Sequence, residues 1–571
     1  MIILKGQPIV AHLAFGSARF TGHGPRQRKD WGSAFDPKEE ESRFNAGLRR
    51  LSDRLHQTFQ IARKKMGEAE AQIFEAHRQM LEDPAFQDEI RLRISQWGYS
   101  AAGAVQAAID LFRGRYARST EDKIRLMAAE LAGLGEDLLD ELEEKERPAG
   151  AIGPMIDFVA QVTPRMVMRA QMENVVGFVA SSGGPTAHAT ILARALEIPM
   201  VVNVPDWRGK VRDGDRTILD GTAGAVFVNP DKENDAIYRD IGERLAKARL
   251  ELLANRDLPA TTRDDCRIIL QANISLTAET EEIERFGAEG VGLYRSELSY
   301  LLRNHYPTEE ELTDIYRTLA EQLGAKPLTV RTLDVGGDKT PLYFGLRATR
   351  NPLLGLRSLR LLATHREVLQ TQFRAILRAS AATDNFRVMF PLIGSIEEWR
   401  EAREAFFEAR EQLRSAGHAC QEDIPLGLMI ELPSAALSAR ALLKEADFAS
   451  IGTNDLTQYI LGVDRNEGTV ARLYRPISPP LLELLKRIID AGRETGKPVS
   501  LCGELAGDPQ YVPLLIGLGL RTLSMNPEAI PLVKNRVRQV GLRDCEQLAR
   551  EALDETSVTG ILKRIAAFGE D

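Results

Sequence analysis

The last part of the chain, residues 261–571, alternates between short apolar runs and helical patterns, and few folds accommodate that alternation. Eight of the apolar runs have the length and composition of buried strands: Ile268–Ile274, Gly290–Tyr294, Leu328–Leu333, Phe386–Phe390, Leu426–Ile430, Phe448–Ile451, Val499–Leu501 and Thr522–Met525. Helical patterns separate these runs. Because eight strand–helix units in about 250 residues or somewhat more are typical of a (β/α)8 barrel, we predict that fold here.

In such a barrel, catalytic side chains lie at the carboxyl ends of the strands. The predicted strand ends carry arginine, carboxylate, amide and thiol groups: Arg295, Arg331, Glu431, Asn454, Asp455 and Cys502, with Arg357 and Arg465 in nearby loops. Several arginines around one cleft favour an anionic ligand held by bidentate hydrogen bonds. The pair Glu431 and Asp455 suggests a hard cation such as Mg²⁺ that bridges to phosphate oxygens. The alternative is a set of salt bridges at the barrel rim.

Residues 181–194, SSGGPTAHATILAR, form a second candidate site. They follow the apolar run Val175–Ala180, and Gly183 with Gly184 allows the backbone to turn tightly. A helical pattern follows the glycines, which places His188 in the first turn of a helix. The free backbone N–H groups there favour a phosphoryl group, and a neutral imidazole is a nucleophile. A capping histidine without a chemical role is the alternative.

Four parts of the chain are distinguished by their patterns. Asp36 and Pro37 predict the start of a helix, and apolar residues at helical spacing then predict an all-α bundle. A long charged helical pattern over residues 231–258 ends before Pro259 and is typical of a linker. The predicted domains are a small α/β domain (1–20 and 148–230), an inserted helical bundle (21–147), a linker helix (231–260) and the barrel (261–571).

The composition is that of a soluble globular protein: of 571 residues, 43% are hydrophobic and 27% are charged. The net charge of −8 argues against nucleic acid as a partner and permits a basic protein partner. No run of about 18 apolar residues occurs, so we expect no membrane insertion. The N-terminus lacks a signal-peptide pattern and the four cysteines lack metal-ligand spacing, so we expect a cytoplasmic protein with reduced thiols.

The histidine stretch resembles the phosphohistidine loop shared by enzyme I of the sugar phosphotransferase system, pyruvate phosphate dikinase and phosphoenolpyruvate synthase. The family pattern is roughly Gly-Gly-x-Thr-Ser-His-x-x-x-x-Ala-Arg, and the matching residues are Gly183, Gly184, Thr186, His188, Ala193 and Arg194. Two positions depart from the pattern. Pro185 stands where enzyme I usually has arginine, and Ala187 stands where the family usually has serine. These departures leave the nucleophile in place.

The barrel resembles the phosphoenolpyruvate-binding domain of enzyme I over its full length. The matching stretches are GAEGVGLYRSE (287–297), RTLDVGGDKTPL (331–342), NPLLGLRSLR (351–360), QFRAILRAS (372–380), MFPLI (389–393), IELPSAA (430–436), SIGTNDLTQY (450–459) and CGELAGD (502–508). The N-terminal half matches more loosely, through IFEAHRQMLED (73–83) and the histidine loop. The chain is therefore identified as a member of the enzyme I family, which implies a multidomain α/β protein with a swivelling phosphohistidine domain, an inserted helical bundle, a linker helix and a C-terminal TIM barrel.

The resemblance implies a role for each site residue. Glu431 and Asp455 would bind Mg²⁺, and Cys502 would protonate the enolate formed from phosphoenolpyruvate. The residues that would bind phosphoenolpyruvate are Arg295, Arg331, Asn454, Arg465, Arg357 and Lys339. The chemistry agrees with these roles, because a thiol with a pKa of about 8.5 is mostly protonated at neutral pH. Phosphoryl transfer also depends more on positioning and charge neutralisation than on covalent work.

The resemblance also implies a relay. His188 would attack the phosphorus and pass the phosphoryl group to a histidine of the phosphocarrier protein HPr, which is the first step of sugar uptake. The domain that carries His188 would swing on the linker to reach both partners. The bundle resembles the HPr-docking domain, and its candidate contacts are Ile73, Phe74, Met80 and Leu81 with the acidic Glu68, Glu70, Glu75 and Glu82. Because the family is dimeric through the barrel domain, we expect a homodimer.

Three alternatives remain open. A dikinase or phosphoenolpyruvate synthase relative would carry a nucleotide-binding domain ahead of the histidine domain, and the sequence contains no glycine-rich phosphate loop followed by lysine. The nitrogen-related branch of enzyme I usually has an additional N-terminal sensory domain, and none fits before residue 20. A phosphoenolpyruvate-binding regulatory protein with impaired phosphotransfer is the third alternative, because Pro185 and Ala187 depart from the loop pattern.

Overall fold

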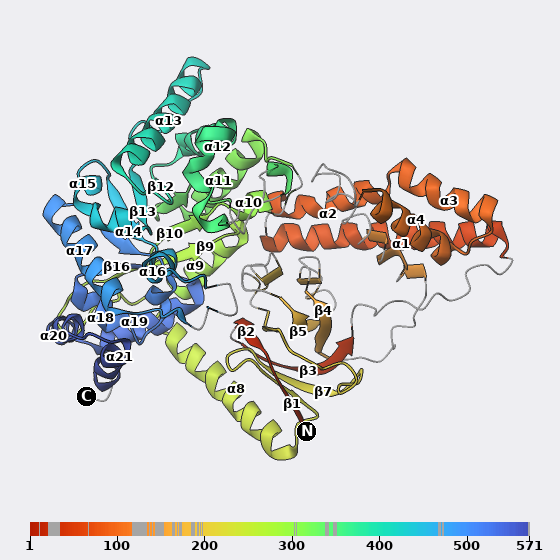
Figure 1. Cartoon of the computed structure of the whole chain (residues 1–571), viewed down its shortest axis with the longest axis horizontal. Coiled ribbons are helices and arrows are strands. Elements are labelled where there is room, and N and C mark those ends of the chain that lie inside the picture. The colour runs from red at the N-terminus through yellow and green to blue at the C-terminus, as the bar shows by residue number, and fades with distance from the viewer. Residues whose placement is uncertain are drawn as a thin grey trace. The chain divides into compact units, whose positions relative to one another are not determined.

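The computed structural model describes residues 1–10, 12–20, 35–66, 68–116, 134, 135, 137–139, 141, 142, 153–162, 166, 167, 170, 174–183, 189, 190, 193, 196, 198–301, 303, 305–336, 342–345, 351–465, 470 and 473–568. The chain forms two compact units (Figure 1). The first comprises Met1–Gly242 with Leu302–His305 and Pro341–Arg347. The second comprises Glu243–Leu301, Tyr306–Thr340 and Ala348–Asp571.

An eight-stranded sheet forms the β part of the first unit. Its strands are β1 (Ile2–Lys5), β2 (Gln7–Val10), β3 (Leu13–Phe20), β4 (Met155–Gln161), β5 (Val175–Ser182), β6 (Met200–Val202), β7 (Arg216–Asp220) and β8 (Ala225–Val228), in the order β1-β8-β7-β3-β4-β5-β6-β2. The run from β3 through β4 and β5 to β6 is parallel, and the remaining pairs are antiparallel. The sheet therefore joins the first residues of the chain to the segment that contains the histidine loop.

Strand β4 lies inside the sheet, between β3 and β5, and the sequence patterns did not predict it. Its sequence, MIDFVAQ, contains a carboxylate, Asp157, which weakens the appearance of a buried strand. Arg19 of β3 satisfies that carboxylate with two hydrogen bonds, of 2.6 Å from Nε and 2.9 Å from Nη2. A partner from a neighbouring strand thus allows a charged residue in a central strand.

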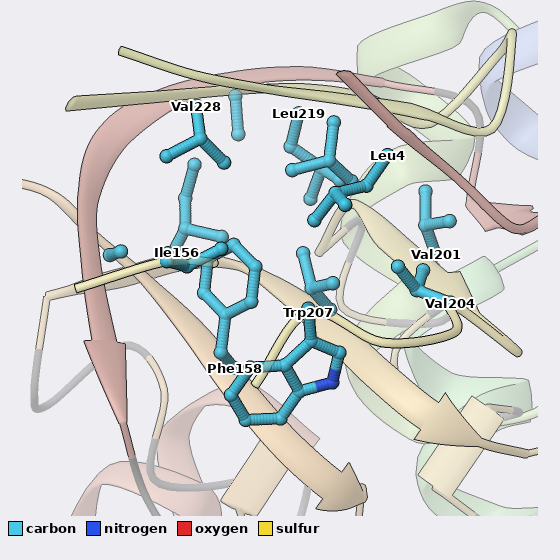
Figure 2. Close-up of a cluster of buried hydrophobic side chains, with 13 residues drawn as sticks. Leu4, Ile156, Phe158, Val201, Val204, Trp207, Leu219 and Val228 are labelled. Carbon is cyan, nitrogen blue, oxygen red and sulfur yellow. The ribbon is translucent and has the colours of Figure 1, made fainter. Parts of the chain in front are cut away.

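The hydrophobic core of this sheet surrounds an aromatic pair, Phe158 of β4 and Trp207. Their ring centroids are 5.5 Å apart. Figure 2 shows them among aliphatic side chains of Leu4, Ile156, Val201, Val204, Leu219 and Val228. The indole Nε1 of Trp207 donates a hydrogen bond of 2.7 Å to Ser181 Oγ. The core therefore holds the end of β5, the strand from which the histidine loop departs.

The described residues of the first unit include four long helices that precede β4: α1 (Pro37–Met66), α2 (Glu68–Leu81), α3 (Pro84–Trp97) and α4 (Ala101–Tyr116). Helix α1 starts at the predicted position, and Asp36 Oδ1 accepts a hydrogen bond of 3.0 Å from the Lys38 amide, as an N-terminal cap does. Glu40 accepts a bond of 2.6 Å from the Ala101 amide and so ties α1 to the start of α4. Phe44 and Leu51 of α1 are fully buried.

Helix α8 (Lys232–Leu253) follows the sheet, where a helix over residues 231–258 is predicted. The helix exists, but it ends at Leu253, and the next residues form turns in which Asn255 and Arg256 donate back to Leu252 and Leu253. The predicted end near Pro259 is therefore wrong by several residues, because proline stops a helix without requiring it to continue that far. The division between the two units falls inside α8, between Gly242 and Glu243.

The second unit contains a closed barrel of parallel strands, as predicted. The strands are β9 (Ile269–Ile274), β10 (Val291–Arg295), β11 (Leu328–Arg331), β12 (Phe386–Phe390), β13 (Leu426–Ile430), β14 (Phe448–Ile451), β15 (Val499–Leu501) and β16 (Thr522–Met525), and β16 pairs with β9 to close the ring. Each predicted apolar run corresponds to one strand. The agreement arises because barrel strands are buried on both faces and so are apolar throughout.

Helices surround these strands (Figure 1). They are α9 (Thr280–Phe286), α10 (Leu298–Leu301), α11 (Glu309–Leu323), α12 (Leu362–Ala379), α13 (Ile396–Ser415), α14 (Pro433–Leu437), α15 (Ala439–Leu443), α16 (Thr453–Leu461), α17 (Pro479–Thr495), α18 (Val512–Leu518), α19 (Ile530–Gln539), α20 (Leu542–Leu553) and α21 (Val558–Ala567). None of the helices in the described part of the chain has the length and apolar character needed to cross a membrane.

Candidate functional site

The structure places the sequence-predicted residues of the barrel at the carboxyl ends of its strands. Arg295 and Arg331 are the last residues of β10 and β11, and Glu431 directly follows β13. Asn454 and Asp455 lie in the first turn of α16, after β14, and Cys502 follows β15. Arg357 lies just before a short 3-10 helix in the loop after β11, and Arg465 follows α16. The parallel direction of the strands thus brings these groups to one end of the barrel.

Asp455 lies between two of the predicted arginines. Its Oδ2 accepts a hydrogen bond of 3.0 Å from Arg357 Nη2, and its Oδ1 is 3.0 Å from Arg465 Nη2. Arg357 also forms a bidentate pair with Asp334, in which Nε donates to Oδ1 at 2.9 Å and Nη2 donates to Oδ2 at 2.9 Å. Asp334, Arg357 and Asp455 are all buried. The arginines and carboxylates therefore form one connected network rather than separate pairs at the rim.

Arg331 belongs to the same network. Its Nη2 donates to Glu297, and its Nη1 is 3.5 Å from Asp334 Oδ2. Burial alone would lower the pKa of Arg331, but the carboxylates of Glu297 and Asp334 outweigh burial and raise the pKa above its usual value. Among the described residues, Arg331 Nε and Arg465 Nη1 are buried and have no hydrogen-bond partner. Such unsatisfied cationic N–H groups are expected where an anionic ligand binds.

Glu431 is a buried carboxylate of the site with a raised pKa. Its side chain is only 2% exposed, and Oε1 accepts a hydrogen bond of 2.7 Å from the Leu392 amide. Burial first, and then the negative charges of Asp455 and Asp334, raise the pKa of Glu431 to about 8. A carboxylate crowded by two others in a buried position is a site that a cation would stabilise.

The donor set fits Mg²⁺ in its usual mode of binding. Within the described residues, no group of three or more histidine, cysteine, aspartate or glutamate side chains is arranged to hold a metal by itself. Mg²⁺ usually binds one or two carboxylates and completes its six-fold shell with water and substrate phosphate oxygens. Glu431 and Asp455 could supply those two carboxylates, and their mutual repulsion is an observation that a bound cation would explain.

Cys502 lies in an apolar environment next to these charges. Its side chain is 3% exposed and packs in a cluster with Leu293, Met389, Met429 and Phe448. The thiol Sγ is 3.6 Å from the carbonyl oxygen of Ile451, the end of the neighbouring strand β14. Burial raises the pKa of the Cys502 thiol above its ordinary value. The thiol therefore stays protonated at neutral pH and is able to donate a proton.

The loop after β15 and the start of α16 pack closely together. Asn454 Oδ1 accepts a hydrogen bond of 3.1 Å from the Glu504 amide. A Cβ atom at Gly503 would lie 1.8 Å from Thr453 Oγ1 and 2.9 Å from the Thr453 amide nitrogen, so only glycine fits there. The absence of a side chain at Gly503 lets the turn that carries Asn454 and Asp455 approach Cys502.

Two sequence-predicted site residues, His188 and Lys339, lie outside the described residues, as do Pro185 and Ala187. The residues on either side of the histidine loop are described. Gly183 donates a hydrogen bond of 3.2 Å from its amide to Asn203 Oδ1, and Ala189 and Thr190 are helical and buried. The described residues after the loop are therefore helical, which is compatible with the predicted helix, and the predicted turn itself lies outside the described residues.

Two of the predicted apolar docking contacts in the bundle are wrong. Phe74 and Leu81 are 2% and 0% exposed, so they pack inside the bundle and offer no surface to a partner. Glu75 of α2 and Glu82, the residue after α2, do lie at the surface, but both form ion pairs with Arg78 of α2, at 2.5 Å and 2.6 Å. Spacing along a helix shows which residues share a face, but it does not show which face the neighbouring helix covers.

Sequence reasoning assigned no role to Asp334 or Glu297, although both lie in the stretches that match enzyme I. Each is a carboxylate that holds a site arginine, Asp334 on Arg357 and Glu297 on Arg331. A signal was present in the sequence. Both carboxylates occur within three residues of an arginine at the end of a barrel strand, a place where a charged side chain needs a partner.

Three family models match the chain. They are described as the PEP-binding domain of PEP-utilising enzymes (residues 249–542), the N-terminal domain of PEP-utilising enzymes (5–125) and the mobile domain of PEP-utilising enzymes (154–224). Together they span both units, and the first of them covers the barrel and its site.

Curated relatives resemble the chain over nearly its whole length. A protein of Listeria innocua named phosphoenolpyruvate-protein phosphotransferase is 36% identical over 535 residues, which are 93% of this chain and 93% of the relative. A protein of Bacillus subtilis with the same name is 34% identical over 529 residues, 92% of this chain and 93% of the relative. A solution structure titled Enzyme I is 26% identical and covers 43% of this chain and 99% of its own, with a TM-score of 0.35. By the extent and identity of the two curated matches, the chain belongs to the phosphoenolpyruvate-protein phosphotransferases, a family of enzymes.

Proposed function

We propose that this enzyme transfers the phosphoryl group of phosphoenolpyruvate to its own His188 and then to a histidine of the phosphocarrier protein HPr, releasing pyruvate. This is the first step of sugar uptake by the phosphotransferase system. One observation carries the proposal: buried arginine N–H groups without partners lie in the same charged network as a carboxylate pair suited to Mg²⁺. That combination matches a ligand with a phosphate and a carboxylate group.

In this proposal the barrel binds phosphoenolpyruvate through its cationic and amide groups: Arg295, Arg331, Arg357, Lys339, Asn454 and Arg465. The unpartnered Arg331 Nε and Arg465 Nη1 support this role, since an anion would satisfy both donors. Glu431 and Asp455 would hold Mg²⁺, which when bound supplies positive charge beside the phosphoryl oxygens. Fixed charges in a buried site stabilise a developing enolate more than they would in water.

The first transfer consists of a displacement at phosphorus and a protonation at carbon. An imidazole nitrogen of His188 forms a bond to phosphorus, and the bond between phosphorus and the enol oxygen breaks with its electron pair left on oxygen. The Cys502 thiol then gives its proton to C3 of the resulting enolate, which yields pyruvate and a thiolate that regains a proton from solvent. Burial that keeps the thiol protonated supports Cys502 as the donor.

The second transfer requires His188 to reach a partner protein. We assign residues 1–20 and 148–230 to the domain that carries His188, 21–147 to HPr docking, 231–260 to the linker and 261–571 to the barrel, which would also form a homodimer. A histidine that serves two sites implies that its domain swings, and helix α8 would permit this. We expect the reaction to take place in the cytoplasm, where phosphoenolpyruvate and HPr are found.

Labelling by radioactive phosphoenolpyruvate tests the proposal. The purified protein is incubated with the label, with and without Mg²⁺, beside His188→Ala, Glu431→Gln and the control His418→Ala, which alters an exposed histidine of the barrel unit. We expect acid-labile label that requires Mg²⁺, is absent from the His188 variant and is retained by the control. Purified HPr should then remove the label.

Absence of label in the unaltered protein, despite measurable binding of phosphoenolpyruvate, would contradict this proposal. It would favour the regulatory alternative, in which Pro185 and Ala187 disable the histidine loop. Label that needs ATP instead of phosphoenolpyruvate would point to a dikinase-like reaction.

A further inference from the structure

The backbone of Cys502 is held unequally by the strands on its two sides. Strand β15, which leads to it, has three residues and pairs with β14 at three positions, and the Cys502 amide continues that ladder with a bond of 3.1 Å to the Ile451 carbonyl. On the other side, the register with β16 consists of a single pair, Leu501 with Leu523. The register with β16 therefore does not extend to Cys502.

A side chain from a third strand, β9, bonds the carbonyl oxygen of Cys502. Asn273 of β9 donates from Nδ2 to the Cys502 carbonyl oxygen at 2.9 Å and to the Ser524 carbonyl oxygen at 3.3 Å. The Ser524 hydroxyl donates in turn to Asn273 Oδ1 at 2.6 Å. Because the two carbonyl oxygens can only accept, the NH₂ group of Asn273 faces them, and the Ser524 hydroxyl then donates to the amide oxygen and holds the side chain in this orientation.

The barrel makes room for this pair. Ser524 of β16 is completely buried, and it lies opposite Gly292 of β10. A Cβ atom at Gly292 would lie 2.4 Å from Ser524 Oγ and 2.7 Å from Gln271 Oε1, so any side chain there would displace the serine. Gly292 thus leaves the space that the Ser524 hydroxyl occupies, and that hydroxyl bonds Asn273. Packing alone does not require a buried hydrogen-bonded hydroxyl at this place.

We propose that Asn273, oriented by Ser524, is a positioning residue for the Cys502 thiol in the protonation of the enolate. This inference rests on the proposed role of Cys502 as the proton donor. Proton transfer to carbon requires the S–H group within reach of one face of the enolate, and a displacement of about 1 Å can cost up to ~100-fold in rate. By bonding the Cys502 carbonyl, Asn273 fixes the backbone from which the thiol projects.

The test compares Asn273→Ala and Ser524→Ala with the control Ser500→Ala. Ser500 lies on β15 itself, and its hydroxyl donates to the Ala449 carbonyl at 3.4 Å instead of to the Asn273 pair. Rapid-quench measurement of pyruvate formation, over a range of phosphoenolpyruvate concentrations, separates the maximal rate from the half-saturating concentration. We expect the maximal rate to fall about tenfold in Asn273→Ala and less in Ser524→Ala. The half-saturating concentration should stay within about twofold in all three variants, because the arginines are untouched.

A second measurement separates positioning from a general loss of stability. The same two substitutions are made in a Cys502→Ala background, where no thiol remains to be positioned. If Asn273 and Ser524 act through Cys502, their substitution should reduce the maximal rate of pyruvate formation little beyond the reduction already caused by Cys502→Ala. The effects of groups that work together are not additive. An equal additional loss in both backgrounds would overturn the inference, and so would a normal rate in both single variants.

Failure of the underlying function gives a different result. If the unaltered protein forms neither pyruvate nor phosphohistidine, the proposed function fails, and this inference fails with it. If the unaltered protein reacts but the Asn273 and Ser524 variants behave like Ser500→Ala, only the inference fails. Should Asn273→Ala not fold, Ser524→Ala alone decides, since it removes one hydroxyl and leaves the asparagine in place.

Discussion

Asp455 illustrates how single buried charges are satisfied in this site. Its two carboxylate oxygens are each 3.0 Å from a guanidinium nitrogen, one of Arg357 and one of Arg465. A buried carboxylate without partners would cost several kcal/mol, so the protein's own arginines neutralise it. A bound cation would compete with these arginines for the same oxygens. The proposed Mg²⁺ would therefore free arginine N–H groups for the phosphate and carboxylate of phosphoenolpyruvate.

Asp264 provides a pH-dependent prediction far from the site. Its carboxylate accepts bonds from the Thr262 hydroxyl at 2.6 Å and from the Leu542 amide at 2.8 Å, at the start of α20. These bonds, the Thr262 bond first, lower the pKa of Asp264 from 3.8 to about 2. Because the folded pKa lies below the unfolded value, the stabilisation is complete above pH of about 4 and is lost as the pH falls toward 2.

The measurement is the urea midpoint of Asp264→Asn relative to the unaltered protein at several pH values. We expect the variant to unfold at lower urea above pH of about 4, and the difference to shrink toward pH 2. Asp554→Asn, an exposed aspartate at the other end of α20, is the control and should show no such trend. A difference that is constant with pH would contradict the prediction.

At the scale of elements, the close packing of α16 against the turn after β15 determines the geometry of the site. Helix α16 carries Asn454 and Asp455, and Gly503 is the contact point. Its backbone has φ −75° and ψ 170°, which any residue adopts, so the requirement for glycine is purely steric. The position of the proposed metal ligand thus depends on the lack of one methyl group.

Gly503→Ala should therefore impair binding. The new Cβ would lie 1.8 Å from Thr453 Oγ1, so α16 must move away and take Asp455 with it. We expect the dissociation constant for phosphoenolpyruvate with Mg²⁺, measured by calorimetric titration, to rise about tenfold or more, with a loss of about 1–3 kcal/mol in stability. Gly507→Ala is the matched control, because its nearest neighbours are 3.3 Å away. Equal affinities for both variants would show that α16 is not constrained in this way.

Helix α2 supports a prediction about the partner. Arg78 pairs with Glu75 and Glu82, and its hydrogen bond holds the pKa of Glu75 below the usual value. If a basic carrier docks on this face, Arg78 competes with it for the two carboxylates. Arg78→Ala should then increase the rate of label transfer to HPr at low salt by a few fold and steepen its dependence on salt.

The control for Arg78 is Arg49→Ala, which removes the same charge from an exposed position on helix α1. If both variants change the transfer rate equally, the effect arises from net charge. The prediction that Arg78 competes with the carrier for Glu75 and Glu82 is then wrong. If neither variant changes it, the docking face lies elsewhere on the molecule.

At the scale of the whole molecule, the chain consists of two units with separate cores. The sheet of the first unit packs around Phe158 and Trp207, and the barrel of the second closes on itself through β16 and β9. The proposed ligand sites in the barrel belong entirely to the second unit. Binding of phosphoenolpyruvate should therefore stabilise that unit without directly stabilising the first.

Scanning calorimetry with and without phosphoenolpyruvate and Mg²⁺ tests this expectation. We expect two unfolding transitions, and the ligands should raise the midpoint temperature of only one of them. At a hundredfold excess of ligand over the dissociation constant, the free energy of unfolding of that unit should rise by about 2.7 kcal/mol. The Asp455→Asn variant should lose that shift and keep both transitions. A shift of both transitions by the same amount would mean that the two units unfold as one.

Much of the barrel and of its candidate site followed from the sequence by itself. Apolar runs mark strands because barrel strands are buried on both faces, and polar residues directly after them mark the active end because parallel strands share a direction. These are local properties of the chain, so Glu431, Asp455 and Cys502 are recognisable without coordinates. The departure of the histidine loop from β5 is local in the same sense.

Other features depended on the tertiary structure, because they involve contacts between residues that are distant in sequence. Asn273 bonds a carbonyl 229 positions away, and Arg19 satisfies Asp157 across 138 positions, which allows a charged residue in central strand β4. The burial of Phe74 and Leu81 likewise depends on which helix covers which face. Periodicity specifies the faces of an element, whereas only the folded chain specifies what each face contacts.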